Sequence, residues 1–370
     1  MYLKKISLLN FKSYQQLDLD LHSKINCFVG NNGQGKTNLL DAVYYLSMCK
    51  SSLNPTDYQN IRHTEDFFVV QGIYDRLGEE DNIYCAVQRN SSKVFKRNGK
   101  EYQRLADHIG HIPIVIISPT DTSLIAEGSE ERRKFLNTVI SQYDKVYLDK
   151  LMRYNKLLAN RNKLLKDMRE GGNYSYDLLE VIDDQLSTLA LSIFEKRKEF
   201  ANHLTPFFQE YYTTVSGDAE KVEIEYQSHL QNGNLKDLLA SSLDKDRILQ
   251  YTTKGIHKDE IAFKYNDQPL KREGSQGQQK TFLIALKLAQ FRYMCDMLPV
   301  KPILLLDDIF DKLDPFRVQQ FIRLVAHNGF GQIFITDANK SRLDNIMERI
   351  GGGFNLFNVD NGEVQIIRNA

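Results

Sequence analysis

The sequence predicts an α/β fold, a mixed β-sheet with helices that is interrupted by an inserted helical lobe. Residues 2–29 alternate apolar and polar side chains in short runs, a pattern typical of consecutive strands. Residues 302–309 form a nearly continuous apolar run, which is typical of a buried parallel strand. From residue 121 to residue 216, apolar side chains recur instead at three-, four- and seven-residue steps, as on one face of a long helix. Strand-rich ends therefore flank a helical middle.

This change of period sets the predicted domain boundaries. A chain of 370 residues is long enough for two domains. We expect residues 1–120 and 250–370 to form one lobe around the sheet, and residues 121–249 to form the inserted helical lobe. Within the insertion, Gly171-Gly172 is expected to separate two long helices.

Composition and charge limit the classes of function. The hydrophobic fraction is 42% and the charged fraction 26%, as in ordinary soluble globular proteins. Basic and acidic residues number 48 each, so the formal net charge is +0 and any polyanion would need a local basic patch. The four cysteines show no metal-ligand spacing, and no apolar stretch is long enough for a membrane span or a signal peptide. We expect a cytoplasmic protein without a membrane partner.

A phosphate-binding loop follows the strand that ends at Val29. Residues 30–37 read GNNGQGKT, which fits the pattern G-x-x-x-x-G-K-[ST] between a strand and a helix. Glycines let backbone N–H groups turn toward the phosphates of ATP, Lys36 would reach the β- and γ-phosphates, and Thr37 would ligate Mg²⁺. The residues predicted to contact ATP here are Gly30, Asn31, Asn32, Gly33, Gln34, Gly35, Lys36, Thr37 and Asn38.

A second motif is the apolar strand that ends in two acids, Asp307 and Asp308. A strand commonly ends in an acidic loop residue, but a phosphate loop in the same chain favours a Walker B segment. In that interpretation Asp307 binds Mg²⁺, and Asp308 orients and polarises the attacking water. The predicted catalytic residues are Asp308 and, through its contact with the phosphates, Lys36.

The third motif, GSQGQQKT at residues 274–281, opens an apolar helix about 30 residues before the acid strand. A plain helix N-cap at Ser275 or Thr281 would also explain the local sequence. The order of phosphate loop, helical insertion, signature loop and acid strand is, however, that of an ABC-type P-loop ATPase head. In that architecture Ser275, Gly277 and Gln278 contact the ATP of a second subunit, which implies an ATP-dependent, head-to-tail homodimer.

Taken together, the motifs resemble those of the RecF family, bacterial DNA replication and repair ATPases related to the SMC proteins. The resemblance extends over residues 10–12, 30–38, 118–121, 132–133, 161–162, 255–259, 275–279 and 304–308. It implies a further ATP contact from Lys12, weak DNA-stimulated ATP hydrolysis, and binding of double-stranded and gapped DNA. It also implies a role in recombination and in the SOS response to DNA damage, with RecO and RecR as mediator partners that assist recombinase loading. The chain has lysine at positions 12, 258 and 280, where the resemblance would imply arginine.

A local basic excess marks a candidate DNA-binding segment. Between residues 145 and 170, basic residues outnumber acidic ones, and such a helix could follow the phosphates of duplex DNA. A solvated helix face would show the same composition. The candidate DNA contacts are Lys150, Arg153, Lys156, Arg161 and Lys163.

Two alternatives to an ATP-gated DNA clamp stay open. One is a transporter ATPase subunit, although Thr336-Asp337 stands where transporter ATPases usually carry a histidine. The other is an ATP-gated scaffold with negligible turnover.

Overall fold

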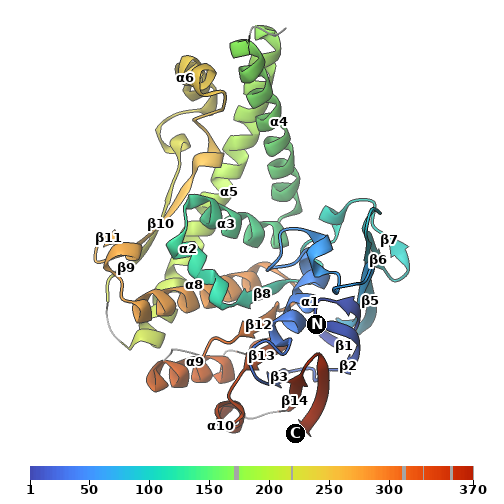
Figure 1. The fold of residues 1–370 in the computed structure, drawn as a ribbon. Coiled ribbons are helices and arrows are strands. Elements are labelled where there is room, and N and C mark those ends of the chain that lie inside the picture. The colour runs from blue at the N-terminus through green and yellow to red at the C-terminus, as the bar shows by residue number, and fades with distance from the viewer. Residues whose placement is uncertain (171–174, 218–219, 311–313, 328, 351–352, 370) are drawn as a thin grey trace. The chain divides into compact units, whose positions relative to one another are not determined.

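Contacts between residues divide the chain into two units (Figure 1). Unit 1 contains Met1–Asp121, Tyr211–Asp218 and Gln276–Ala370, and unit 2 contains Thr122–Glu210 and Ala219–Ser275. The computed structural model describes residues 1–170, 175–217, 220–310, 314–327, 329–350 and 353–369. The predicted break at Gly171-Gly172 lies outside the described residues.

The central sheet of unit 1 is six-stranded, in the order β15-β14-β3-β13-β12-β8. All neighbours pair in parallel except β14 and β15, which are antiparallel. The bounds are β3 Ile25–Val29, β8 Ile114–Ile117, β12 Ile303–Asp307, β13 Ile333–Asp337, β14 Phe354–Asp360 and β15 Glu363–Asn369. Every residue of β3, β12 and β13 is buried, which confirms the prediction drawn from the apolar run at 302–309. Because β3 and β12 both run parallel to β13, their carboxyl ends meet at one edge of the sheet.

A second sheet of unit 1 is antiparallel, in the order β2-β1-β4-β5-β6-β7. Its strands are β1 Tyr2–Phe11, β2 Tyr14–Asp20, β4 Phe67–Arg76, β5 Glu79–Gln88, β6 Val94–Arg97 and β7 Lys100–Glu101. In β4 and β5 buried residues alternate with more exposed ones, the period expected when one sheet face packs on a core.

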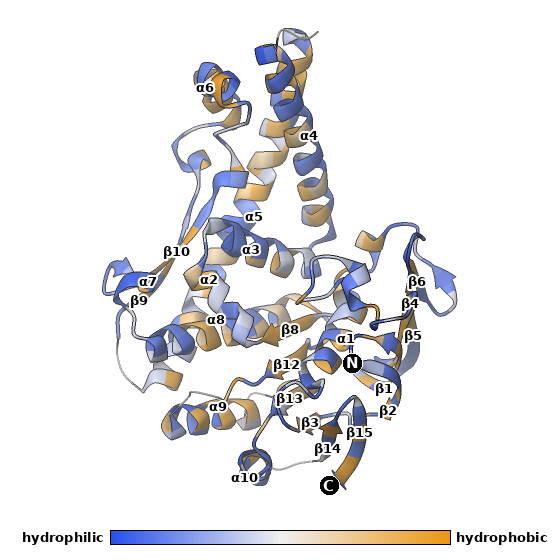
Figure 2. Ribbon diagram, viewed as in Figure 1, coloured by the Kyte–Doolittle hydropathy of each residue, from blue (hydrophilic) through white to orange (hydrophobic). Residues whose placement is uncertain are grey.

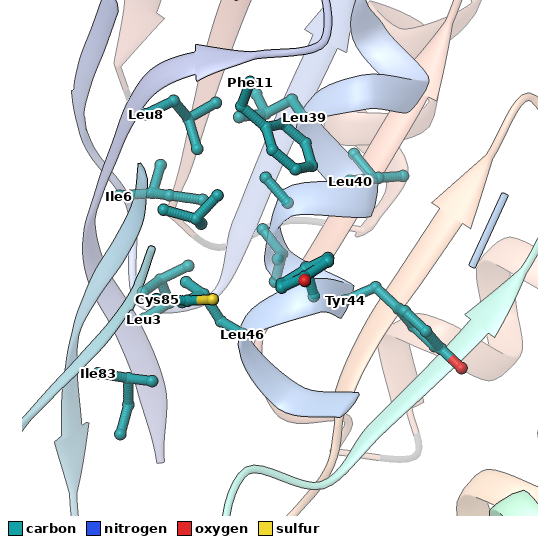
Figure 3. Close-up of a cluster of buried hydrophobic side chains, with 14 of the residues drawn as sticks. Leu3, Ile6, Leu8, Phe11, Leu39, Leu40, Tyr44, Leu46, Ile83 and Cys85 are labelled. Carbon is teal, nitrogen blue, oxygen red and sulfur yellow. The ribbon is translucent and has the colours of Figure 1, made fainter. Parts of the chain in front are cut away.

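Helix α1, Lys36–Met48, packs into the core of unit 1 with residues of both sheets. Figure 3 shows Leu39, Leu40 and Leu46 of α1 beside Ile6 and Leu8 of β1. The same buried cluster includes Phe28 of β3 and Leu305 of β12, which belong to the parallel sheet. The start of α1, where the phosphate-loop motif ends, is therefore fixed by a hydrophobic core.

Unit 1 is completed by α8 Gln276–Met297, α9 Pro315–His327 and α10 Lys340–Ile350. Helix α8 buries residues on all its sides between Thr281 and Gln290, as expected of a helix enclosed in a core. Short 3₁₀ helices occupy Asp57–Asn60, Leu105–Asp107 and Pro119–Thr122.

Unit 2 is mainly helical. Its helices are α2 Ser123–Ala126, α3 Ser129–Tyr143, α4 Lys145–Glu170, α6 Leu235–Leu249, α7 Leu270–Glu273 and the larger part of α5 Tyr176–Ser216. A three-stranded antiparallel sheet joins β9 Val222–Gln227, β10 Glu260–Tyr265 and β11 Gln268–Pro269, and 3₁₀ helices occupy His229–Asn232 and Ile256–Lys258. Figure 2 shows hydrophobic and hydrophilic residues interspersed along α4, the amphipathic pattern that predicted it. Leu165 and Met168 of α4 are buried against Leu179 of α5.

The contact-based boundaries differ from the predicted ones at two places. Residues 250–275 were expected in the sheet lobe, but β10 pairs with β9 along its length and so belongs to unit 2. Residues 211–216, at the end of α5, fall in unit 1, where Tyr212 is buried and its ring contacts Phe282 of α8. Strand pairing and ring packing join residues that are far apart in the sequence. The local spacing of apolar residues therefore does not predict them.

Candidate nucleotide-binding site

The phosphate-loop motif forms the connection between β3 and α1, as its sequence context predicted. Two of its glycines have no room for a side chain. A Cβ on Gly30, at φ 156°, would lie 2.2 Å from the carbonyl oxygen of Val359, and one on Gly35, at φ 112°, would lie 2.8 Å from Oγ of Ser13. Both positions combine a left-handed backbone with a close approach, so only glycine is compatible. The loop is thus held between the backbone of β14 at Gly30 and the side chains of Ser13 and Tyr14 at Gly35.

The N-terminus of α1 carries the partial positive charge of the helix dipole, and no acidic side chain in the first turn neutralises it. Gly35 at the N-cap makes no side-chain capping bond, and the first turn has no acidic residue. The amino group of Lys36, itself 3% exposed, donates hydrogen bonds to the carbonyl oxygens of Gly30 (2.7 Å) and Asn31 (3.0 Å). The loop therefore curls around this ammonium group. A helix N-terminus whose N–H groups lie near a cation is suited to bind phosphate oxygens.

Asp307, at the end of β12, connects directly to the phosphate loop. The Thr37 hydroxyl donates to Oδ1 of Asp307 at 2.9 Å, and Thr336 of β13 donates to the same oxygen at 2.7 Å. Burial raises the pKa of Asp307, and the hydrogen bonds from Thr336 and Thr37 oppose that rise. The structure thus brings together the two side chains predicted to bind Mg²⁺.

The chemistry of this oxygen pair fits Mg²⁺. A hydroxyl and a carboxylate are oxygen ligands, which Mg²⁺ prefers, and the ion usually takes its remaining ligands from water and substrate phosphates. Within the described ranges there is no group of three His, Cys, Asp or Glu side chains that could enclose a metal. The Thr37 hydroxyl and the Asp307 carboxylate therefore suit a cation that binds together with a nucleotide.

Asp308 departs from the strand conformation at φ 45°. Its N–H donates to the Thr336 hydroxyl at 3.0 Å, so a single buried hydroxyl contacts both acidic positions. Sequence reasoning noted Thr336 only as the residue in place of a transporter histidine. No local pattern could have found it, because its role follows from its pairing with Asp307 across two parallel strands.

Lys12, which the resemblance assigned to ATP, has a different partner in the structure. Its Nζ lies 2.6 Å from Oδ2 of Asp41, and the two side chains are 7% and 1% exposed. Asp41 also accepts hydrogen bonds from Ser51 and Ser52. This ion pair neutralises the charge of Lys12 in the structure, and the ATP contact from Lys12 stays a prediction. Asn38 likewise donates to the Ser13 hydroxyl at 2.9 Å.

The signature motif is the beginning of α8 rather than a loop before it. The helix starts at Gln276, which gives Ser275 the N-cap position, and Gly277 and Gln278 lie in the first turn. Thr281, an alternative N-cap by sequence, is inside the helix, and its hydroxyl donates to the carbonyl oxygen of Gly277 at 2.9 Å. Ser275 is exposed. Ser275 thus lies at a helix N-terminus, where the helix dipole favours an anion.

The five candidate DNA contacts on α4 separate into different classes. Arg161 is fully buried: Nε donates to Asp183 at 2.6 Å and Nη1 donates to Asp246 at 2.7 Å. This corrects the prediction that Arg161 contacts DNA, because both ends of its guanidinium hold carboxylates inside unit 2. Lys150 is half-buried and donates to the Ser192 hydroxyl at 2.5 Å.

The other three, Arg153, Lys156 and Lys163, are exposed and form no ion pair with any described residue. Their spacing of three and seven residues places them on one face of α4. We call these three residues the α4 basic stripe.

Comparison with known proteins gives one consistent family. The chain matches the model of the RecF/RecN/SMC N terminal domain over residues 2–356. It is 52% identical over 366 residues to the DNA replication and repair protein RecF of Phocaeicola vulgatus, covering 98% of each chain. It is 44% identical over 366 residues to the protein of the same name from Porphyromonas gingivalis, covering 98% of this chain and 100% of that one.

Solved structures agree in fold. The chain is similar to the recombination mediator protein RecF-ATP of the RecFOR pathway, with 32% identity, a TM-score of 0.89, and coverage of 99% of this chain and 98% of that chain. It is also similar to the Smc head bound to the C-winged helix domain of ScpA, with 14% identity, a TM-score of 0.59 and coverage of 99% and 97%, which supports the fold alone. In the described part of the chain, no helix has the length and apolar character to cross a membrane.

Proposed function

The chain belongs to the RecF proteins of the RecF/RecN/SMC N-terminal domain family, and on that premise we propose that it is an ATP-dependent DNA-binding protein that hydrolyses ATP slowly. The observation that carries the proposal is the contact of Thr37 with Asp307, because it joins the phosphate loop to the acid strand. The RecF-ATP structure, at 32% identity over nearly the whole chain, supports ATP as the nucleotide.

The residues of unit 1 divide the chemistry among them. The N–H groups of residues 30–37 and the Lys36 ammonium hold the phosphates, and Thr37 and Asp307 hold Mg²⁺. When bound, Mg²⁺ neutralises charge on the phosphate oxygens. Asp308 orients the attacking water and accepts its proton. Thr336 keeps the two acids in register through its hydroxyl.

Ser275, Gly277 and Gln278 contact the γ-phosphate of ATP bound to a second copy of the chain. The exposure of Ser275 at the start of α8 supports this role, because an exposed residue at a helix N-terminus can meet another subunit. Two copies then enclose ATP in a head-to-tail dimer with two-fold symmetry. ATP binding therefore controls assembly.

The dimer holds double-stranded DNA next to single-strand gaps, and the α4 basic stripe contributes to that contact without reading sequence. The three exposed cations support this assignment, because none of them forms an ion pair with a described carboxylate. RecO and RecR are the proposed protein partners, in keeping with the RecFOR pathway named for the similar structure.

The test is the fluorescence anisotropy of a labelled gapped duplex titrated with protein in ATP, in ADP, and with the Lys36→Met variant in ATP. Lys24→Met, the same change at an exposed lysine of unit 1, is the control. Tight binding in ATP that disappears in ADP and in Lys36→Met supports the proposal. Equal binding under all conditions, or none, contradicts it and favours a protein-partnered ATPase.

A further inference from the structure

The turn of the C-terminal hairpin contacts the phosphate loop through its backbone. Strands β14 and β15 are joined by Asn361 and Gly362, at φ 49° and 82°, the left-handed pair of a tight two-residue hairpin. The N–H of Asn361 donates to Oε1 of Gln34 at 2.5 Å, and the N–H of Gly362 donates to the carbonyl oxygen of Gln34 at 3.2 Å. Both central amides of the turn therefore bond to one residue of the loop.

The β1–β2 turn also packs closely against both the hairpin turn and the phosphate loop. A Cβ on Gly362 would lie 2.8 Å from the carbonyl oxygen of Ser13, which is in the β1–β2 turn. The Ser13 hydroxyl in turn lies 2.8 Å from the position that a Cβ on Gly35 would take. Tyr14, at the start of β2, donates to the carbonyl oxygen of Gly35 at 3.0 Å. Two turns from opposite ends of the sequence thus hold the loop.

We propose that the Asn361-Gly362 turn is a positioning element of the nucleotide site. By fixing the main chain and side chain of Gln34, the turn sets the curvature that directs the loop N–H groups toward the phosphates. A loop that is already ordered loses less conformational entropy on binding, so the turn raises affinity for the nucleotide. The inference rests on the proposed function of the phosphate loop as an ATP site, and it extends that site to the last strands of the chain.

A second Asn-Gly hairpin turn in unit 1 provides a matched control. Asn98 and Gly99 join β6 and β7 at φ 50° and 78°, nearly the same conformation as Asn361 and Gly362. A Cβ on Gly99 would meet nothing within 4 Å. Alanine is therefore unfavourable at the positive φ of both turns. Only at Gly362 would its methyl group also clash with a neighbouring segment.

The experiment compares Gly362→Ala and Gly99→Ala with the wild-type chain. Dissociation constants for a fluorescent ATP analogue are measured alongside the melting temperature without nucleotide. We expect Gly362→Ala to weaken binding by about tenfold or more, and Gly99→Ala by less than about twofold. The close approach to Ser13 should also lower the melting temperature of Gly362→Ala further, so binding is measured well below the melting temperatures of both variants. Equal dissociation constants for the two variants overturn the inference. If the wild-type chain itself does not bind the analogue, the proposed ATP site fails as well.

Hydrogen exchange of the wild-type chain gives an answer even if Gly362→Ala does not fold. The amides of residues 360–363 should exchange more slowly when ATP is added, because a nucleotide on the loop stabilises the bonds to Gln34. The amides of residues 97–100 should not change. Equal exchange at 360–363 with and without ATP also overturns the inference.

Discussion

The buried Thr336 hydroxyl donates a 2.7 Å hydrogen bond to Oδ1 of Asp307, its partner across two parallel strands. The same hydroxyl accepts a 3.0 Å bond from the N–H of Asp308. One oxygen on β13 therefore fixes both the proposed metal ligand and the start of the turn that carries the proposed base. A residue that touches neither nucleotide nor metal can in this way control the geometry of hydrolysis.

The first prediction concerns this hydroxyl. Thr336→Val keeps the shape of the side chain but removes both hydrogen bonds, and we expect the ATP hydrolysis rate to fall about 10- to 100-fold. The dissociation constant for ATP should change by less than about threefold, because the phosphate loop is untouched. Thr336→Ser restores the hydroxyl and should recover most of the rate. Equal hydrolysis by the valine variant and the wild type would show that Thr336 only fills space.

The second prediction concerns the buried ion pairs of Arg161. Arg161→Met leaves Asp246, which is 0% exposed, without its cation, and we expect the free energy of unfolding to fall by about 3–5 kcal/mol. Lys163→Met, the same kind of change at an exposed position two residues away, should alter it by less than about 0.5 kcal/mol. Urea denaturation measures both. Similar stabilities for the two variants would contradict the structural role given to Arg161.

The third prediction concerns the α4 basic stripe. Replacing Arg153, Lys156 and Lys163 by glutamine should weaken the binding of gapped duplex. The slope of log affinity against log salt concentration should also become shallower, by about one for each phosphate contact that is lost. The control changes Lys221, Lys236 and Lys264 to glutamine, because these surface lysines of unit 2 already pair with carboxylates. Anisotropy titrations across a salt series measure the slope. An equal weakening in both triple variants would mean that total charge, not the stripe, governs binding.

The fourth prediction concerns pH. Burial lowers the pKa of His108 to about 4, and the fully buried ring contacts the carbonyl oxygen of Leu46 at 2.7 Å and the hydroxyl of Tyr102 at 3.1 Å. The unfolded chain, with a histidine pKa near ~6.5, then binds the proton more readily than the folded chain. Stability is lost as pH falls from about 6.5 to about 4, by on the order of 3 kcal/mol from this group.

Unfolding by urea at a series of pH values tests this sign. His108→Gln keeps an N–H that can donate to Leu46 but does not titrate, so its unfolding free energy should depend less on pH across that interval. Parallel pH curves for His108→Gln and the wild type would rule out the contribution of His108.

Sequence patterns predicted the features of the structure that depend on short segments of the chain. The phosphate loop, the acid strand and the amphipathic α4 were each predicted from residue type and spacing, because strand ends, glycine turns and helical periods are properties of short segments. GSQGQQKT was interpreted as a loop that opens a helix, yet only Gly274 and Ser275 precede α8, and Gln276–Thr281 form its first turns. Its glycines weakened the helix signal, whereas burial of the residues that follow determined the helix.

Long-range pairing could not be predicted in this way. Arg161 shares the helical spacing of the buried residues of α4 and Lys163 does not, but the carboxylates on α5 and α6 that pair with Arg161 could not be predicted. Lys12 is held by Asp41, and Gln34 by a turn more than 300 residues away. Such contacts depend on which segments meet in space, and one sequence by itself does not contain that information.

The central claim is that each ATP is held by the phosphate loop of one copy and the signature helix of another. The most direct test mixes Lys36→Met, which lacks a working loop, with Ser275→Arg, which lacks a working signature, and measures ATP hydrolysis. Each variant alone should be inactive, whereas a mixed dimer has one intact composite site, so an equal mixture should recover up to about a quarter of the wild-type rate. A mixture that is no faster than either variant alone would contradict the composite site.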